Sequence, residues 1–134
     1  DCQGGRGLKL EGLDHVAITV RDPLTSMAWY QDVLGLERRF EEAWGDYPIV
    51  MLAGESGVAL FPASSADPVS VHDKRDTVTM RHFAFRVDRE NFNRAQERMR
   101  WAGVQFTRED HGVSHSIYIH DPDGHEIEIT TYDL

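Results

Sequence analysis

The stretch DHVAITVRDP (residues 14–23) returns half a chain later as RHFAFRVDRE (81–90). Both stretches follow the pattern His-x-Ala-apolar-x-Val, and their two-residue alternation predicts a β-strand with one face on a core. His15 and His82 occupy the same place in these two strands, on the face opposite the large apolar side chains. A repeated strand with a repeated histidine indicates a fold built from two copies of one module.

Each predicted strand leads into a predicted helix with a start and a stop signal. Asp22 can cap the first helix, Pro23 fits its first position, and Gly35 ends it. Asp88 and Gly103 do the same for the second helix. The apolar stripes are predicted at Leu24, Met27, Ala28 and Leu34 in the first helix and at Phe92, Ala95, Met99 and Ala102 in the second.

Short strand-like runs follow each helix, at about 36–44, 47–53 and 57–62 and then at about 104–107, 115–120 and 125–132. Both halves therefore read βαβββ, which predicts an α+β fold of paired modules forming a cup-shaped mixed sheet. The expected organisation is a flexible leader (1–12), a first module (13–62), a polar linker (63–78) and a second module (79–134) within one domain.

The composition limits the partners that the chain can have. With 134 residues and a formal net charge of -9, the chain is a poor binder of nucleic acid or of anionic membranes. It has no apolar run long enough to span a bilayer, and no apolar segment typical of a signal peptide lies among its first residues. Its single cysteine, Cys2, forms no disulfide framework. We therefore expect a cytoplasmic protein.

Alternation along the last strand places two carboxylates, Glu126 and Glu128, on the same face as His15 and His82. A carboxylate inside a cup must be paired, protonated or bound to a cation. Two histidines and one carboxylate suit an octahedral divalent metal that keeps open positions for water or substrate. The spacing alone leaves open which glutamate binds.

Three stretches together resemble the vicinal oxygen chelate superfamily: LDHVAITVRDPLTSMAWYQDVLGL, RHFAFRV and SIYIHDPDGHEIEI. This superfamily includes glyoxalase I, bleomycin-resistance proteins, fosfomycin-resistance enzymes and extradiol dioxygenases. The resemblance implies paired βαβββ modules, a homodimer, and a metal held by His15, His82 and Glu128.

The second half is most similar to the extradiol ring-cleavage dioxygenases. Their signature is matched by His111, Tyr118, the turn Asp-Pro-Asp-Gly at 121–124, and Glu128. Glu109 departs from it, because the family prefers a small or apolar residue there. The resemblance implies that His111 is the acid/base, that Tyr118 donates a hydrogen bond near the metal, and that the substrate is catechol-like. Fe(II) is the favoured metal, with Mn, Ni or Zn possible.

Other branches of the superfamily remain alternatives. A glyoxalase-type lyase or isomerase would use proton transfer, although Leu60 stands where glyoxalase I has a further carboxylate ligand. Fosfomycin enzymes carry a cationic residue after the metal glutamate, which the tail ITTYDL lacks. Methylmalonyl-CoA epimerases use carboxylates as proton shuttles, a role for which Glu126 is a weak candidate. A bleomycin-resistance-like protein would bind a ligand without chemistry.

The remaining histidines and aromatic residues receive structural interpretations. His115 competes with His111 for the acid/base role, whereas His120 and His125 are expected to be solvated around the turn. That turn is expected to set the register of the Glu128 strand. Three aromatic residues near the first module's cup are assigned to core or dimer packing rather than to substrate: Trp44, Tyr47 and Phe61.

Overall fold

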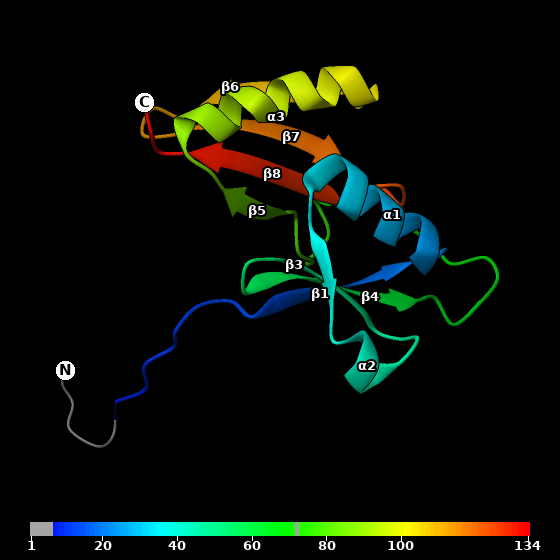
Figure 1. Ribbon diagram of the computed structural model, residues 1–134. Coiled ribbons are helices and arrows are strands. Elements are labelled where there is room, and N and C mark those ends of the chain that lie inside the picture. The colour runs from blue at the N-terminus through cyan, green and yellow to red at the C-terminus, as the bar shows by residue number, and fades with distance from the viewer. Residues whose placement is uncertain (1–6, 72) are drawn as a thin grey trace.

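The computed structural model describes residues 7–71 and 73–134, so that part of the expected leader, with Cys2, lies outside the described residues. The first module contains β1 (His15–Val20), α1 (Pro23–Leu34), β2 (Glu37–Arg39), α2 (Glu41–Trp44), β3 (Ile49–Ala53) and β4 (Ser56–Pro62). The second contains β5 (Phe83–Arg86), α3 (Arg89–Ala102), β6 (Thr107–Asp110), β7 (His115–His120) and β8 (Glu126–Thr131). The expected α+β class with two repeated modules is confirmed (Figure 1).

The two modules share one sheet topology. The first sheet has the order β1-β4-β3-β2 and the second has the order β5-β8-β7-β6. In each, the opening strand runs parallel to the closing strand, and the other neighbours are antiparallel. Both sheets are therefore mixed, and β1 and β5 hold equivalent edge positions.

The helix boundaries follow the predicted capping residues. The Asp22 carboxylate accepts hydrogen bonds from the backbone N–H groups of Leu24 and Thr25, and Asp88 accepts one from Asn91. Gly35 and Gly103 end α1 and α3 with φ values of 73° and 71°, in the left-handed region that glycine adopts without strain.

The strand alternation is confirmed, but the predicted stripe of α1 is partly wrong. Ile18 and Val20 are buried, whereas His15 is exposed on the other face of β1. On α1, Leu24 is 58% exposed and Tyr30 is fully buried. Tyr30 enters the core because α1 also packs against the second module, a contact that the helix pattern of one module does not predict.

Two strand boundaries also differ from the prediction. The expected strand at 36–44 is shorter, because Phe40 takes a left-handed backbone conformation (φ 65°) that ends β2 and begins the short helix α2. In the second module, the strand expected at 104–107 is β6 at Thr107–Asp110.

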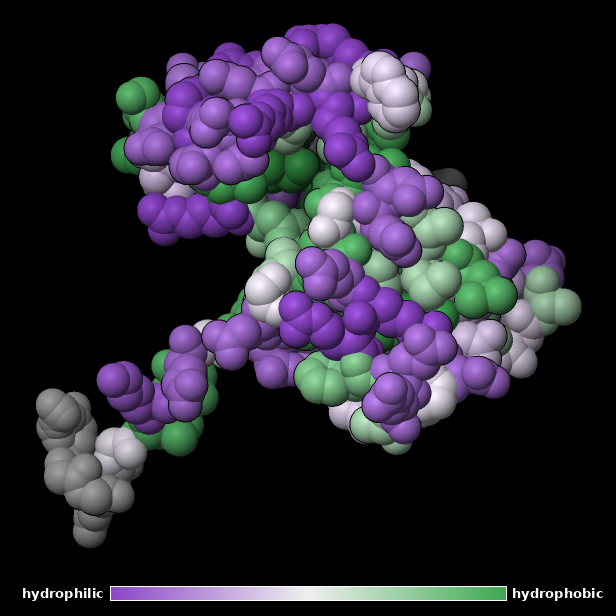
Figure 2. Space-filling model, in the orientation of Figure 1, coloured by the Kyte–Doolittle hydropathy of each residue, from purple (hydrophilic) through white to green (hydrophobic). Residues whose placement is uncertain are grey.

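The modules pack together through their helix-bearing sides. One cluster of buried apolar residues runs through both modules and includes Tyr30, Leu60, Phe92 and Ile127. In the described residues, each strand pairs within its own sheet. Each sheet has one face that its long helix does not cover, and this face is here called the open face. Figure 1 shows α1 and α2 on opposite sides of the first sheet. Figure 2 shows hydrophilic side chains covering the outer surface of α3.

Candidate metal centre

His82 and Glu128 lie side by side on the open face of the second sheet. His82 immediately precedes β5, and Glu128 of β8 pairs in register with Ala84 of β5. This arrangement places His82 Nε2 2.9 Å from Glu128 Oε1. The His82 ring and the Glu128 carboxylate therefore lie within hydrogen-bond distance of each other.

Neighbouring side chains hold both members of this pair. The Ser116 hydroxyl donates a hydrogen bond of 2.6 Å to Glu128 Oε2. Glu126 Oε1 lies 3.7 Å from His82 Nδ1. Because a carboxylate oxygen accepts, the contact of 2.9 Å between His82 Nε2 and Glu128 is a hydrogen bond donated by the imidazole, and a metal bound between the two groups would replace that proton.

His111 and Tyr118 meet at the edge of the same cluster. His111 Nε2 lies 3.0 Å from the Tyr118 hydroxyl and 4.0 Å from Glu128 Oε2. Partial burial and the Glu128 carboxylate raise the pKa of the Tyr118 phenol, so Tyr118 stays protonated and can donate. An imidazole next to a phenol donor can take up or release a proton at a group bound beside Glu128.

His15 lies apart from this cluster, on the open face of the first sheet. Its Nδ1 is 2.8 Å from Asp14 Oδ2, so its Nε2 is the nitrogen left for another partner. Within residues 7–71 and 73–134, no three histidine, cysteine or acidic side chains gather closely enough to hold a metal ion. The chain thus brings together His82 and Glu128 and leaves His15 on the other sheet.

The other histidines take structural positions. His115 turns to the helix-bearing side of the second sheet, where its Nδ1 accepts a hydrogen bond of 2.9 Å from Arg89, so it does not compete with His111. His120 Nε2 lies 3.8 Å from Glu126. His125 Nε2 lies 2.8 Å from the Thr19 carbonyl of β1, a contact between the modules that the interpretation as a solvated residue missed.

The turn at 121–124 fixes the start of β8. Asp121 is buried, and its Oδ1 accepts hydrogen bonds from the backbone N–H groups of Asp123 and His125, both of 2.9 Å. Arg21 at the end of β1 binds Asp123 through Nη1 at 3.1 Å. The turn is therefore anchored to the first module and sets the position of Glu128.

A cavity of about 650 Å³ opens beside the His82 half of the site. It lies between β1, the linker and the start of β5, and it is bordered by Lys74, Arg81, His82 and Glu126. A small molecule can reach His82 from this side.

The sequence patterns gave no role to two residues that shape the site, Asp14 and Ser116, and they placed Glu126 on the right face without its position beside His82 Nδ1. Ser116 could have been found, because it shares a strand face with Tyr118 at a spacing of two residues. Asp14 immediately precedes His15, and this adjacency in the sequence could have identified it as a partner of the His15 ring.

Comparison with known proteins identifies the family. The model of the Glyoxalase/Bleomycin resistance protein/Dioxygenase superfamily matches residues 12–129. The chain therefore belongs to this superfamily, whose members typically depend on a divalent metal and are mostly enzymes.

Individual relatives agree with this membership. The chain is 28% identical over 120 residues to glutathione transferase FosA of Serratia marcescens, covering 90% of this chain and 80% of that protein. A glyoxalase/dioxygenase from Nostoc punctiforme is 20% identical, with a TM-score of 0.75 and 90% of each chain covered. A lactoylglutathione lyase from Agrobacterium tumefaciens is 22% identical, with a TM-score of 0.69, over 91% of this chain and 94% of that one. The two structural likenesses show the fold. None of the helices in the described residues has the length and hydropathy that a membrane crossing requires.

Proposed function

We propose that the protein is a metal-dependent enzyme acting on a small oxygen-bearing substrate, and that its metal is held between two copies of the chain. His82 and Glu128 of one copy and His15 of a second copy would be the ligands. The distance of 2.9 Å between His82 Nε2 and Glu128 Oε1 on an open sheet face carries this proposal.

The donor set fits a divalent cation. His15 has Asp14 beside Nδ1 and can offer Nε2. His82 Nε2 lies against Glu128, and a cation bound between these two groups would replace the proton that they share. Two imidazoles and one carboxylate on one side of a metal suit Fe(II), Mn, Ni or Zn and leave positions for substrate oxygens. When bound, such a cation polarises the substrate oxygens and makes a coordinated hydroxyl more acidic.

A second copy would complete the ligand set, because in the described residues His15 does not gather with His82 and Glu128. His15 belongs to the open face of the first sheet, whereas His82 and Glu128 belong to the open face of the second. In a two-fold symmetric dimer, the first sheet of each copy faces the second sheet of the other, and the same contact occurs twice. Such a dimer would have two identical cups, each with the full ligand set.

The chain's own residues supply the proton chemistry. His111 lies within reach of Glu128 and of the Tyr118 hydroxyl, so it can move a proton at a substrate held beside Glu128. Tyr118 would donate a hydrogen bond to a substrate oxygen, and Ser116 keeps the Glu128 carboxylate oriented.

Two reaction classes follow from different observations. The similarity to FosA favours a transfer or addition reaction that does not consume O₂. Extradiol ring cleavage is the second candidate, and it is favoured by the contact between His111 and Tyr118, which are paired in the dioxygenase signature. Anaerobic purification, metal analysis and O₂ uptake with catechol separate them: Fe(II) with O₂ uptake supports cleavage, and another metal without uptake supports transfer.

Complementation between two inactive variants tests the shared metal site. His15→Ala and Glu128→Gln should each bind far less Mn(II) per chain than the wild type. A mixed dimer of the two variants contains one site with every ligand intact, so co-expression should restore about a quarter of the wild-type sites. Co-expression of His15→Ala with His15→Ala carrying a different tag is the matched control and should restore none. Metal binding that stays absent in the mixed dimers would contradict a site shared between copies.

A further inference from the structure

We infer that a pocket on the open face of the first sheet binds a flat aromatic part of the substrate. This pocket, here called the first-sheet pocket, has a volume of about 310 Å³ and includes His15 in its lining. Its floor and walls are formed by Val50, Leu52, Ala59, Phe40, Trp44 and Phe61. The inference rests on the proposed function, because the metal at His15 would hold the oxygen atoms of the same substrate.

The floor of the first-sheet pocket is a small apolar cluster separate from the main core. Val50, Leu52 and Ala59 pack together on the face of the sheet that α1 does not cover. Gly57 pairs in register with His15 and with Leu52. A Cβ at Gly57 would lie 2.0 Å from the Met51 carbonyl oxygen, so only glycine fits there and the floor beside His15 carries no side chain.

Aromatic rings stand around this floor although they are far from buried. Phe40 and Trp44 are each 52% exposed, and Phe61 is 41% exposed. The rings of Phe40 and Trp44 are 5.1 Å apart and tilted by 50°. Phe40 holds its place with φ at 65°, a conformation that costs energy for any residue with a Cβ. Residues that keep such a conformation concentrate at binding and catalytic sites.

The charged side chains of the first-sheet pocket make only a few close pairs. Asp14 pairs with His15 at 2.8 Å, and Arg39 lies 3.6 Å from Glu37. Glu55 remains at the exposed edge of the pocket. With charged groups confined to the rim and an apolar floor, the first-sheet pocket suits an uncharged ring.

A small aromatic molecule fits this space better than the surface of a second copy does. The second sheet that would face the pocket in the dimer presents His82, Glu126 and Glu128, and burying such ionisable groups on an apolar floor is costly. The volume of 310 Å³ is about twice that of a cavity that holds benzene, which suits one or two fused rings. An aromatic alcohol or diol satisfies both the floor and a metal at His15.

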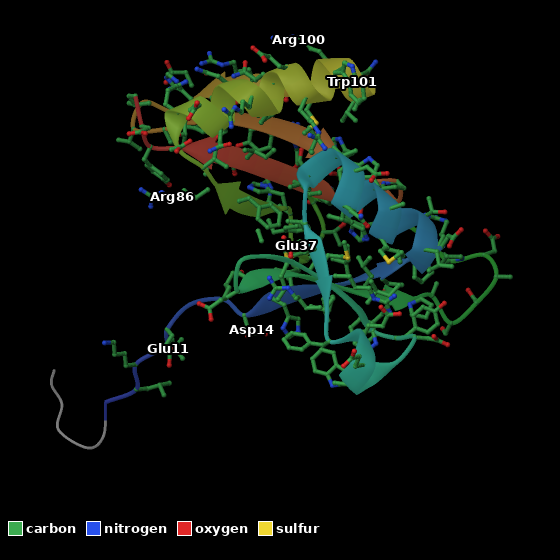
Figure 3. All side chains as sticks on the ribbon, in the orientation of Figure 1. Glu11, Asp14, Glu37, Arg86, Arg100 and Trp101 are labelled. Atoms are coloured by element: carbon green, nitrogen blue, oxygen red, sulfur yellow. The ribbon has the colours of Figure 1, made fainter. Side chains whose placement is uncertain are left out.

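Titration of the metal-free protein with 2-naphthol tests this inference. After EDTA treatment, ¹⁵N-labelled protein should show one indole N–H signal for each of Trp29, Trp44 and Trp101. We expect saturable movement of the Trp44 signal with 2-naphthol and none with 1-butanol at the same concentration. The Trp101 signal should stay in place, because Trp101 lies at the end of α3, away from the first sheet (Figure 3).

Phe40→Gly removes one wall without removing the fold. Glycine takes the left-handed conformation freely, so the thermal midpoint should be unchanged or higher while 2-naphthol binding weakens about tenfold. Trp101→Ala removes an aromatic ring that is 88% exposed elsewhere and should bind 2-naphthol as the wild type does. Equal binding by wild type and Phe40→Gly, or movement of the Trp44 signal only on concentrating the protein, would overturn the inference.

A variant at a metal ligand distinguishes a failure of this inference from a failure of the proposed function. Glu128→Gln should lose Mn(II) binding and keep the affinity of the metal-free protein for 2-naphthol. If 2-naphthol binds while neither protein binds metal, the aromatic pocket stands and the metal-dependent function falls. If metal binds and the Trp44 signal does not respond to 2-naphthol, the substrate class inferred from the pocket is wrong.

Discussion

The hydroxyl of Tyr30 donates a buried hydrogen bond of 2.8 Å to Asp121 Oδ2, joining α1 of the first module to the turn that begins β8 of the second. The other oxygen of the Asp121 carboxylate, Oδ1, accepts hydrogen bonds from backbone N–H groups of the turn. One side-chain pair therefore connects the packing of the two modules to the position of Glu128.

Tyr30→Phe should destabilise the protein without leaving a large cavity. The substitution leaves Asp121 Oδ2 buried without its donor, which costs about 1.5–3 kcal/mol of the free energy of unfolding. Urea unfolding followed by circular dichroism measures this loss. Tyr132→Phe, at a half-exposed tyrosine, is the control and should change the free energy little.

The same tyrosine should make stability depend on pH in alkaline solution. Burial and the Asp121 carboxylate raise the pKa of the Tyr30 phenol far above its ordinary value of 10.0. Above pH 10 the unfolded chain releases this proton and the folded protein keeps it, so stability falls by about 1.4 kcal/mol per pH unit. Tyr30→Phe lacks this loss, and the gap between the two free energies of unfolding should narrow above pH 10. A gap that stays constant to pH 11.5 would contradict the raised pKa.

His111→Ala should separate metal binding from proton transfer. Metal content should equal that of the wild type, and the turnover number should fall by about 10²–10⁴ if His111 carries the proton. Stopped assays on metal-loaded protein measure both quantities. His120→Ala changes an exposed histidine that lies beside Glu126, and its turnover should stay close to that of the wild type. Equal rates for both variants would exclude the acid/base role of His111.

Gly57→Ala should destabilise the first sheet. Its Cβ would meet the Met51 carbonyl oxygen at 2.0 Å, and because backbone must move to admit it, we expect a loss of about 1–3 kcal/mol. Differential scanning calorimetry should show the lower midpoint. Ser56→Ala, at the exposed neighbouring position, should leave the midpoint within experimental error.

The strand patterns and capping residues predicted each module well, because both signals are local. The alternation around His15 and His82, and the start and stop residues of α1 and α3, are determined by neighbours in the chain. The strand predicted at 36–44 missed α2, and this error also had a local cause. Phe40 takes a left-handed backbone conformation that a phenylalanine in the sequence does not indicate.

The packing between modules could not be predicted in the same way. His15 and His82 are equivalent in the two repeats, and this shows where each lies in its own sheet. It does not show which sheets face each other. Tyr30 was missed for the same reason, because its partner Asp121 belongs to the other module. The pair His82 and Glu128 was predictable because β5 and β8 are neighbours inside one module.

If two copies share the metal as proposed, the separation of His15 from His82 and Glu128 ties the occupancy of the cation to self-association. Dilution that splits the dimer would release the ion, and a chelator would in turn weaken the dimer, since each equilibrium draws on the free energy of the other. The protein would then respond to its own abundance as well as to the supply of metal.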